Sequence, residues 1–495
     1  MVFASGFLGS LERMIRQLSE EGASKLEEEL PYAAMMITLM SASGITPYDG
    51  FKRLRSVESL PNFREEADVL IREVEVLGKD PLTAMESRAE STKSKNYRDF
   101  LAGYISSVKS GGSVVSFLKS KLRSIFDVRI ADATHAIARL ETLVEAYMVM
   151  LIVVLCLYIL STILSSAILP PRSGINLPSL GDPLPLVMVL IPSVSLIFMF
   201  LAHRLRHGTM KEIKQPYRRA IIPAAGSVAL LLSLMFVPSM RFIVNLLGLP
   251  LIVCLCLVVV SAPPALIYLS IMKIERSAEI ALPSFLRDMT EARKTGLSPE
   301  KSITHAANRR GYGPFSTILK RMTNQIGLGI SLRRIFEELK SSILSWPVNI
   351  CFRILVETIE IGGGAPETLE LLAEYSEKMR DIEENQRSML RPYILLPFLW
   401  AVLMALTVTF TFYSITQISL PGVTSPFSTL ASRLPLLSAG IIFHCWLSGF
   451  FIGKVSEGMF AAGFKYSPLL AITAYISLVA SESLVKSFFG GLVML

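Results

Sequence analysis

The stretch ALPSFLRDMTEARKTGLSPEKSITHAA, from Ala281 to Ala307, decides how this chain is organised, because a second stretch resembles it. The second stretch is LPYAAMMITLMSASGITPYDGFKRL, from Leu30 to Leu54. In each, a Leu-Pro pair precedes a turn that begins with glycine and ends with proline. Both landmarks recur at an offset of 252 residues, from Pro31 to Pro283 and from Pro47 to Pro299. The chain therefore contains an internal duplication, and a long region separates the two copies.

The composition is typical of a membrane protein. Of the 495 residues, 51% are hydrophobic and 18% are charged, and the mean hydropathy is +0.50. Seven apolar runs are long enough to cross a bilayer, which takes about 20 residues. These runs are residues 146–169, 184–202, 220–238, 242–272, 393–418, 434–453 and 467–486. The fourth run is long and contains prolines, so we expect it to be kinked or to project from the membrane.

The distribution of basic residues predicts an orientation in the cell membrane. With residues 1–142 in the cytoplasm, the segments on that side hold 45 of the 49 Lys and Arg residues. Such an excess marks cytoplasmic loops. We therefore expect a cytoplasmic N-terminus and an external C-terminus. The net charge of +8 is explained by topology and by contact with membrane lipid, so it indicates no nucleic-acid partner.

The two charged blocks are expected to be short helices. Gly44 should end one helix and Thr46-Pro47 should begin the next, because Thr is a good N-cap and proline is tolerated at the first helical position. Gly296 and Ser298-Pro299 repeat this signal in the second block. Neither block alternates like a strand. The expected fold class is all-α, a polytopic membrane protein with about seven transmembrane helices and two duplicated cytoplasmic helical-bundle domains.

The duplication continues to the far end of each block. Ser110-Gly111-Gly112 matches Gly362-Gly363-Gly364 at the same offset of 252, and Gly78 matches Gly327 at an offset of 249. The repeat motif comprises Pro31, Gly44, Pro47, Gly111 and Gly112 in one copy, and Pro283, Gly296, Pro299, Gly363 and Gly364 in the other. The expected segments are an amphipathic N-terminal helix at 1–22, a first cytoplasmic domain at 23–142, four transmembrane helices at 143–272, a second cytoplasmic domain at 273–391 and three transmembrane helices at 392–495.

Each copy is expected to continue into the membrane as a long helix. From Val114 the helical pattern runs without a breaker into the first apolar run, on the order of 50 residues. A second long helix is expected over 367–418, passing through Arg391-Pro392 into the fifth apolar run. Two stiff connections of this kind could carry motion between the cytoplasmic part and the bilayer.

The ordered set of landmarks resembles the type II secretion system F domain. The set is Leu-Pro, then Gly-[Ile/Leu]-[Ser/Thr]-Pro, a mid-domain glycine, and a Gly-Gly break before a helix that enters the membrane. Four spans between the copies and three after them are similar to the archaeal branch of that family, which serves archaella and archaeal pili. The resemblance implies a bundle of about six helices per domain, with a hexameric secretion ATPase and pilin-like subunits as partners. It leaves open whether the platform is a monomer or a homodimer.

Signatures of catalysis are missing from the sequence. GxxxxGK[ST] does not occur, and neither does HExxH, so no nucleotide, metal or other cofactor is expected. His444 stands alone in the sixth run and is expected to be an interhelical histidine. Glu482 and Lys486 have the spacing of a helical ion pair. We expect no enzyme; the alternative is a transporter or channel, against which the span centres argue because they contain almost no charge.

The remaining candidates are basic residues that could bind the ATPase. Six lie in the loop between the second and third apolar runs, and two Arg-Arg pairs lie in the second copy. They are Arg204, Arg206, Lys211, Lys214, Arg218, Arg219, Arg309, Arg310, Arg333 and Arg334. The competing interpretation is that the loop is a topology signal near lipid headgroups and that the pairs are ordinary solvated charges.

Overall fold

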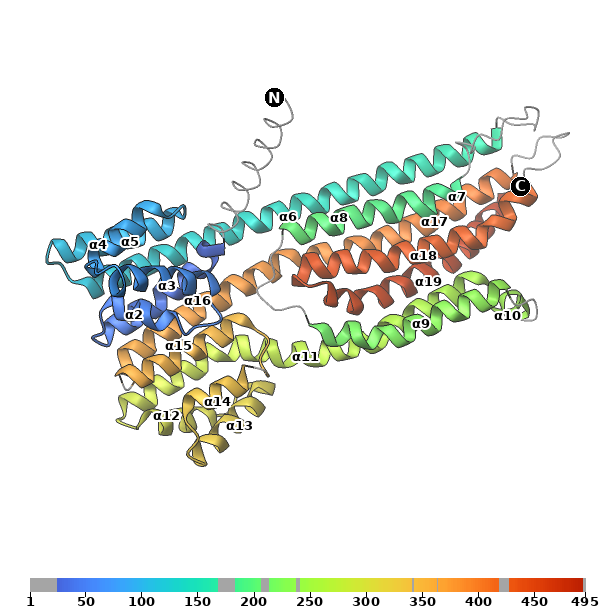
Figure 1. Cartoon of the computed structure of the whole chain (residues 1–495). Coiled ribbons are helices and arrows are strands. Elements are labelled where there is room, and N and C mark those ends of the chain that lie inside the picture. Colours follow the sequence, from blue (N-terminus) through green and yellow to red (C-terminus); the bar gives the residue numbers. More distant parts are fainter. Residues whose placement is uncertain are drawn as a thin grey trace, which may run out of the picture. The chain divides into compact units, whose positions relative to one another are not determined.

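The computed structural model describes residues 25–167, 183–205, 213–236, 241–340, 342–362, 364–417 and 427–492. These residues form helices joined by short loops, with no β-strand in the described part (Figure 1). They divide into two compact units. The repeat unit contains the described residues up to Ala133 together with Ile274–Glu383, and the membrane unit contains those of Thr134–Lys273 and Glu384–Leu495. The all-α prediction is confirmed.

The two copies correspond helix for helix. The first copy consists of a helix at 25–42, α2 (Pro47–Leu54), α3 (Pro61–Glu75), α4 (Pro81–Ser91), α5 (Lys95–Lys109) and the start of α6 (Val114–Ala167). The second consists of the end of α11 (Leu249–Lys294), α12 (Pro299–Ala307), η3 (Gly313–Phe315) with α13 (Ser316–Gly327), α14 (Leu332–Leu339), α15 (Trp346–Gly362) and α16 (Pro366–Leu390). Repeated bundles are therefore present, as the duplication predicts.

The glycine-proline turns form as expected in both copies. Gly44 has φ +90° and Gly296 has φ +89°, a left-handed conformation that is open to glycine and strained for other residues. The next helix is capped by a hydroxyl in each case: the Asp49 amide donates to Thr46 Oγ1 at 3.2 Å, and the Lys301 amide donates to Ser298 Oγ at 3.4 Å. The repeated stretch is thus a helix stop followed by a capped helix start.

One glycine of the repeat was assigned to the wrong position. Gly78 has φ +68°, but its expected match Gly327 is the last residue of α13, and the left-handed turn is made by Gly329 with φ +74°. The offset there is 251 rather than 249 residues. At the far end, Gly111 with φ +67° has its conformational match in Gly364 with φ +64°. Gly363 lies outside the described residues. In the sequence Gly-Leu-Gly either glycine could be the match of Gly78, and only the backbone geometry shows which one makes the turn.

The two copies share one hydrophobic core within the repeat unit. Tyr32 of the helix at 25–42 packs edge-on against Trp346 of α15, with ring centroids 4.3 Å apart. Phe126 of α6 stacks on Tyr375 of α16 at 4.7 Å. Aromatic pairs of this kind add to the free energy gained by burial. Because segments of both expected cytoplasmic domains build this single unit, their division at 23–142 and 273–391 stays a prediction.

Seven helices of the described chain are long and apolar enough to cross a membrane. The membrane unit contains parts of α6 and α11, together with α7 (Pro183–Pro185), η1 (Leu186–Leu190), α8 (Ile191–Leu205), α9 (Lys214–Phe236), α10 (Arg241–Leu247), η4 (Pro392–Ile394), α17 (Leu396–Gln417), α18 (Phe427–Glu457), η5 (Phe460–Ala462) and α19 (Gly463–Leu492). In the apolar window of α18, 67% of residues are buried, against 6% in that of α9. The helix α18 is therefore central to this unit and α9 peripheral.

Three long stretches of the chain could each form one continuous helix: the two predicted long helices and the fourth apolar run. The structure shows that only the first of them is uninterrupted. The helix α6 runs uninterrupted for 54 residues, as predicted. The expected helix at 367–418 is interrupted: α16 ends at Leu390 and η4 precedes α17, because Pro392 lacks an amide hydrogen and clashes with the preceding turn. The fourth apolar run is split at Gly248, and beyond it α11 continues for 46 residues into the second copy. The short α10 cannot span a bilayer, so seven spans remain.

Small residues bring α18 and α19 into close contact. A Cβ atom added at Gly453 would lie 2.2 Å from the Gly463 nitrogen, and one added at Gly449 would lie 2.6 Å from the Ser467 nitrogen. Gly449 and Gly453 have the GxxxG spacing, with which membrane helices approach closely. The spacing is visible in the sequence, but the motif was not among the features predicted from it.

Candidate functional site

The candidate basic residues lie in both units. In the structure some of them already form ion pairs with carboxylates and others do not. Arg309 forms ion pairs with Asp288 and with Glu291, the latter at 3.4 Å. Arg333 pairs with Glu357 at 3.1 Å and with Glu360 at 2.5 Å. Each of these arginines therefore stabilises the second copy, which leaves it less available to a partner.

The other member of each Arg-Arg pair is open to solvent. Arg310 is exposed and forms no ion pair with any described residue. The Arg334 side chain is 76% exposed and lies 4.0 Å from Glu338, at the limit of an ion pair. Exposed pairs of that geometry contribute little to stability. Arg310 and Arg334 are thus the members that could contact another protein.

The basic loop between α8 and α9 belongs to the membrane unit. Arg204 lies over the Phe200 ring, with 5.3 Å between the guanidinium carbon and the ring centroid. Lys214, Arg218 and Arg219, in the first turns of α9, are exposed. Arg206 and Lys211 lie outside the described residues.

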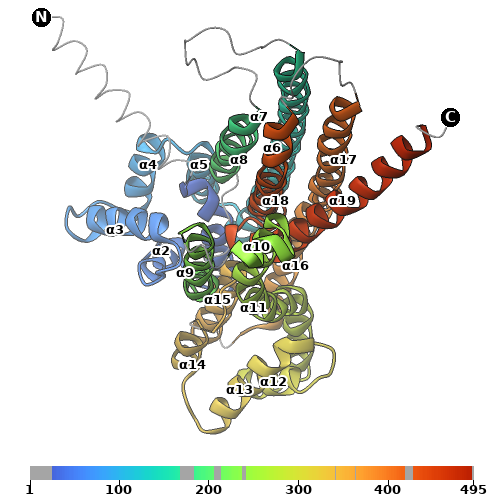
Figure 2. The same cartoon turned by 90° about the vertical axis from the view of Figure 1, so that its right-hand side faces the viewer.

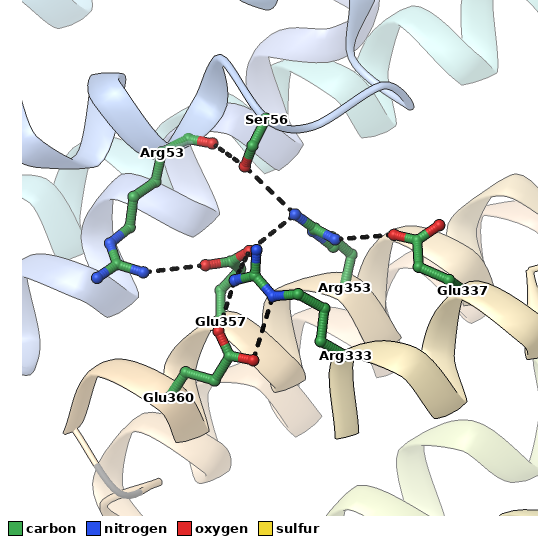
Figure 3. A network of polar contacts seen from close by, with 7 residues as sticks. All are labelled: Arg53, Ser56, Arg333, Glu337, Arg353, Glu357 and Glu360. Atoms are coloured by element: carbon green, nitrogen blue, oxygen red, sulfur yellow. Dashed lines mark hydrogen bonds and ion pairs between the residues drawn. The ribbon is translucent and has the colours of Figure 1, made fainter. Parts of the chain in front are cut away.

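A cluster of charged residues around one buried glutamate joins the two copies, and no sequence pattern predicted it (Figure 3). Glu357 of α15 has a side chain that is only 1% exposed. It forms ion pairs with Arg353 at 2.9 Å, with Arg333 of α14 at 3.1 Å and with Arg53 of α2 at 3.2 Å. Since α2 belongs to the first copy, the Arg53 contact crosses between them. We call this interface the seam.

Further polar contacts lie along the seam. Arg353 Nη2 donates to Ser56 Oγ at 3.2 Å, and Trp346 Nε1 donates to the Ser59 carbonyl at 2.9 Å. Lys340 pairs with Glu58 at 2.6 Å. Each of these contacts joins the segment after α2 to α14 or α15. The segment Ser56–Leu60 is therefore held from the second copy by its side chains and by its backbone.

The charges of the seam balance. Three arginines face three glutamates, because Arg353 also pairs with Glu337 at 3.1 Å and Arg333 with Glu360. A buried carboxylate that accepts several charge-assisted hydrogen bonds is stable in the charged form only while its partners stay in place. The cluster has no surplus positive charge with which to bind an anion. Its chemistry is therefore that of a joint between two folded elements.

One hydrogen bond between a glutamate and a serine occurs at equivalent positions in the two copies. Glu27 accepts from Ser94 Oγ at 3.0 Å, where α5 begins, and Glu279 accepts from Ser345 Oγ at 2.9 Å, where α15 begins. Nearby, burial raises the pKa of Glu29, although the Phe63 and Asn62 amides and the Asn62 side chain donate to it and lower the pKa in part. Buried and half-buried carboxylates thus tie the first helix of a copy to helices that follow later in the chain.

The described residues contain no group of three or more His, Cys, Asp or Glu side chains that could hold a metal. His444 of α18 is interhelical, as predicted: its Nδ1 lies 3.2 Å from Ser195 Oγ of α8. Ser195 also contacts the hydroxyl of Tyr147 in α6 at 3.0 Å. Glu482 and Lys486 form the expected ion pair at 2.7 Å. The contacts of Ser195 join α6, α8 and α18, whereas the Glu482–Lys486 pair lies within α19.

Comparison with known proteins gives a family match in two segments. The model of "Type II secretion system (T2SS), protein F" matches residues 33–162 and 285–412, which together make up more than half of the chain. Each segment covers most of one helical copy and the membrane helix after it. An uncharacterized protein of Methanocaldococcus jannaschii is 24% identical over 512 aligned residues, covering 96% of this chain and 82% of that protein. No solved structure matches the chain.

Proposed function

Because this chain belongs to the protein F family of type II secretion systems, we propose that it is the membrane platform of a machine that assembles type IV pilus-like filaments. Proteins of the family are membrane platforms without catalytic activity and work with a secretion ATPase and pilin-like subunits. The observation that carries the proposal is the coincidence of the two matched segments with the two helical copies. This is a multi-pass membrane protein, and its function follows from surfaces and connections.

The proposed partners follow from the orientation that the basic residues favour. With the N-terminus and the repeat unit in the cytoplasm and the C-terminus outside, a hexameric ATPase would bind the repeat unit. Pilin-like subunits would reach the membrane unit through the bilayer. Arg204, Lys214, Arg218 and Arg219 would lie on the cytoplasmic side, near lipid headgroups or the ATPase. No catalytic residue or cofactor is assigned to the chain.

The proposed mechanism is mechanical. The seam makes one body of the two copies, so a push from the ATPase on either copy would move both. The helix α6, on the order of 80 Å long, and α11 belong to both units and would carry this movement into the membrane. The interruption at η4 makes the third connection less stiff than the other two. Movement of the spans would then admit pilin subunits to a growing filament.

We infer an archaeal filament, either an archaellum or an adhesive pilus. The support is the arrangement of seven candidate spans, four between the copies and three after them, together with a relative from an archaeon. Deleting the gene and observing the cells by electron microscopy identifies the filament, since the one that depends on this platform should be lost. Cells that keep every filament type would contradict the proposed function.

A pair of substitutions in α6 separates a moving platform from a static anchor. Ala131→Gly with Asp132→Gly weakens the helical preference of an exposed part of α6, by about 1 kcal/mol at Ala131 and by less at Asp132, without changing the helix register. We expect filament assembly to fall at least tenfold while the ATPase still binds. The matched control, Asp132→Ala, removes the same charge but raises helix propensity, and it should assemble filaments normally. Normal assembly by the glycine variant would favour an anchor, and ion flux in liposomes would favour a channel.

A further inference from the structure

The helix α13 presents one continuous exposed face. Its solvent-exposed side chains are Thr317, Lys320, Arg321, Asn324 and, directly after its end, Leu328. Spacings of three and four residues place these side chains along a single side of a helix. Both views show α12, α13 and α14 grouped at one edge of the repeat unit (Figures 1 and 2). We call this surface the α13 face.

The α13 face combines an uncovered leucine with unpaired positive charge. Leu328 is 78% exposed, the largest fraction among the exposed large hydrophobic residues of the repeat unit. Lys320 and Arg321 form no ion pair with any carboxylate in the described part of the chain. Arg310 is likewise unpaired, in the loop that precedes η3. Unpaired positive charge beside an exposed apolar side chain suits a partner surface that carries the opposite charge around an apolar pocket.

The first copy provides an internal comparison, because α3 is the counterpart of α13. Leu77, at the equivalent turn, is also exposed, at 65%. The charges differ: on the α3 side Asp68 pairs with Arg55, and Glu75 pairs with Lys52. Residues 47–88 contain seven basic and nine acidic residues, whereas the matching residues 299–340 contain eight basic and three acidic. The two copies therefore share a fold and an exposed leucine, and they differ in sign of charge.

We propose that the α13 face is where the repeat unit binds the ATPase, and that α3 is not used in the same way. This inference rests on the proposed function and adds to it that the second copy, not the first, binds the ATPase. The fitting partner surface is an apolar pocket for Leu328 bordered by Asp or Glu side chains, because opposite potentials favour association and like charges oppose it. The helix α3 has more acidic than basic residues, so the same acidic surface would repel it rather than attract it.

A protein surface fits these observations better than a lipid surface. Segments that bind anionic membranes carry clusters of about four to eight basic residues or a broad apolar face. On α13, Leu319 and Met322 are buried in the core, and Leu328 is the exposed large apolar side chain among the positions of the α13 face. One exposed apolar side chain with a few neighbouring charges suits binding to a pocket on a partner protein.

The test compares matched variants of the full chain in nanodiscs of neutral phosphatidylcholine, with binding of the purified ATPase hexamer as the readout. Lys320→Gln with Arg321→Gln should weaken binding at least tenfold and reduce its dependence on salt. Leu328→Ser should weaken it several-fold at all salt concentrations. The controls Arg64→Gln with Arg72→Gln, and Leu77→Ser, change the same residue types on α3 and should stay within twofold of the native chain.

Each outcome decides the proposal. Equal losses from the α3 and α13 variants would overturn the preference for the second copy. Native binding by every variant would place the ATPase elsewhere while keeping the proposed function, whereas a native chain that binds no ATPase would remove both. A loss seen only with vesicles containing anionic lipid, and not with the ATPase, would assign the α13 face to the membrane surface.

Discussion

Glu357 shows how one buried side chain can hold two folded segments together. Its carboxylate is 1% exposed and is shared by arginines from α2, α14 and α15. Of these arginines, Arg353 is buried, whereas Arg53 and Arg333 are 39% and 45% exposed and remain partly solvated. The Glu357 carboxylate therefore stabilises the fold mainly by pairing with the buried Arg353, whose charge would otherwise be unpaired inside the protein.

Replacing Glu357 by Gln tests the importance of this residue. The change keeps the shape of the side chain and removes the charge that Arg353 needs, so we expect the repeat unit to lose about 2 to 3 kcal/mol of unfolding free energy. Chemical denaturation of the full chain in detergent, followed by tryptophan fluorescence, measures the loss. The control is Glu337→Gln, whose carboxylate is 50% exposed and pairs with the same arginine, and it should cost below about 1 kcal/mol.

Single residues also mark where sequence reasoning succeeds. Gly44 and Gly296, with their Thr46 and Ser298 caps, could be predicted because a cap is a local interaction between neighbours in the chain. Glu357 could not, since nothing near it in the sequence indicates that an arginine 304 residues away would reach it. Long-range contacts of this kind appear only when the fold is known.

At the scale of elements, α18 organises the membrane unit through its small residues. Gly449 and Gly453 allow the backbone of α19 to approach at Gly463 and Ser467. Apolar runs predict that such helices exist, because hydropathy depends on composition alone. They do not predict which faces meet. The same limit explains why the continuity of α6 was predicted while the break between α16 and α17 was not: both sequences read as helical, and only Pro392 marks the difference.

The contact between α18 and α19 can be disrupted by a single methyl group. Gly453→Ala would place a Cβ atom 2.2 Å from a backbone nitrogen of Gly463, so the helices must separate. We expect the melting temperature of the purified protein to fall by several degrees. Gly226→Ala in α9 is the control, because a Cβ atom there meets nothing within 4 Å and alanine favours a helix. Equal stability of the two variants would contradict the close contact.

At the scale of the whole molecule, the duplication produces one repeat unit rather than two separate ones. The internal repeat, the number of spans and the helical class were all predicted from patterns that recur along the chain. The shared core was not, because the sequence shows that two bundles exist without showing which surfaces they bury. We expect the repeat unit, which is built as one body, to respond to force as one body.

Hydrogen exchange can show whether the two copies open together. Trp346 contacts Tyr32 and donates to the Ser59 carbonyl, so Trp346→Ala removes contacts with the first copy from a position in the second. We expect amide exchange to rise at least tenfold in α2 and the helix at 25–42, as well as in α15. An increase confined to α15 would show that the copies open independently. Leu328→Ser, on the surface, should leave all three helices unchanged.

The distance along the chain between the two sides of the seam has a consequence for biosynthesis. Arg53 and Glu357 are separated by 304 residues, and at roughly 5–20 residues per second the ribosome takes roughly 15–60 s to join them. During that interval the first copy has been translated while its partner surface has not, and the first four candidate spans are being inserted. The part of the shared core that the first copy supplies therefore stays uncovered until the second copy is made and completes the fold.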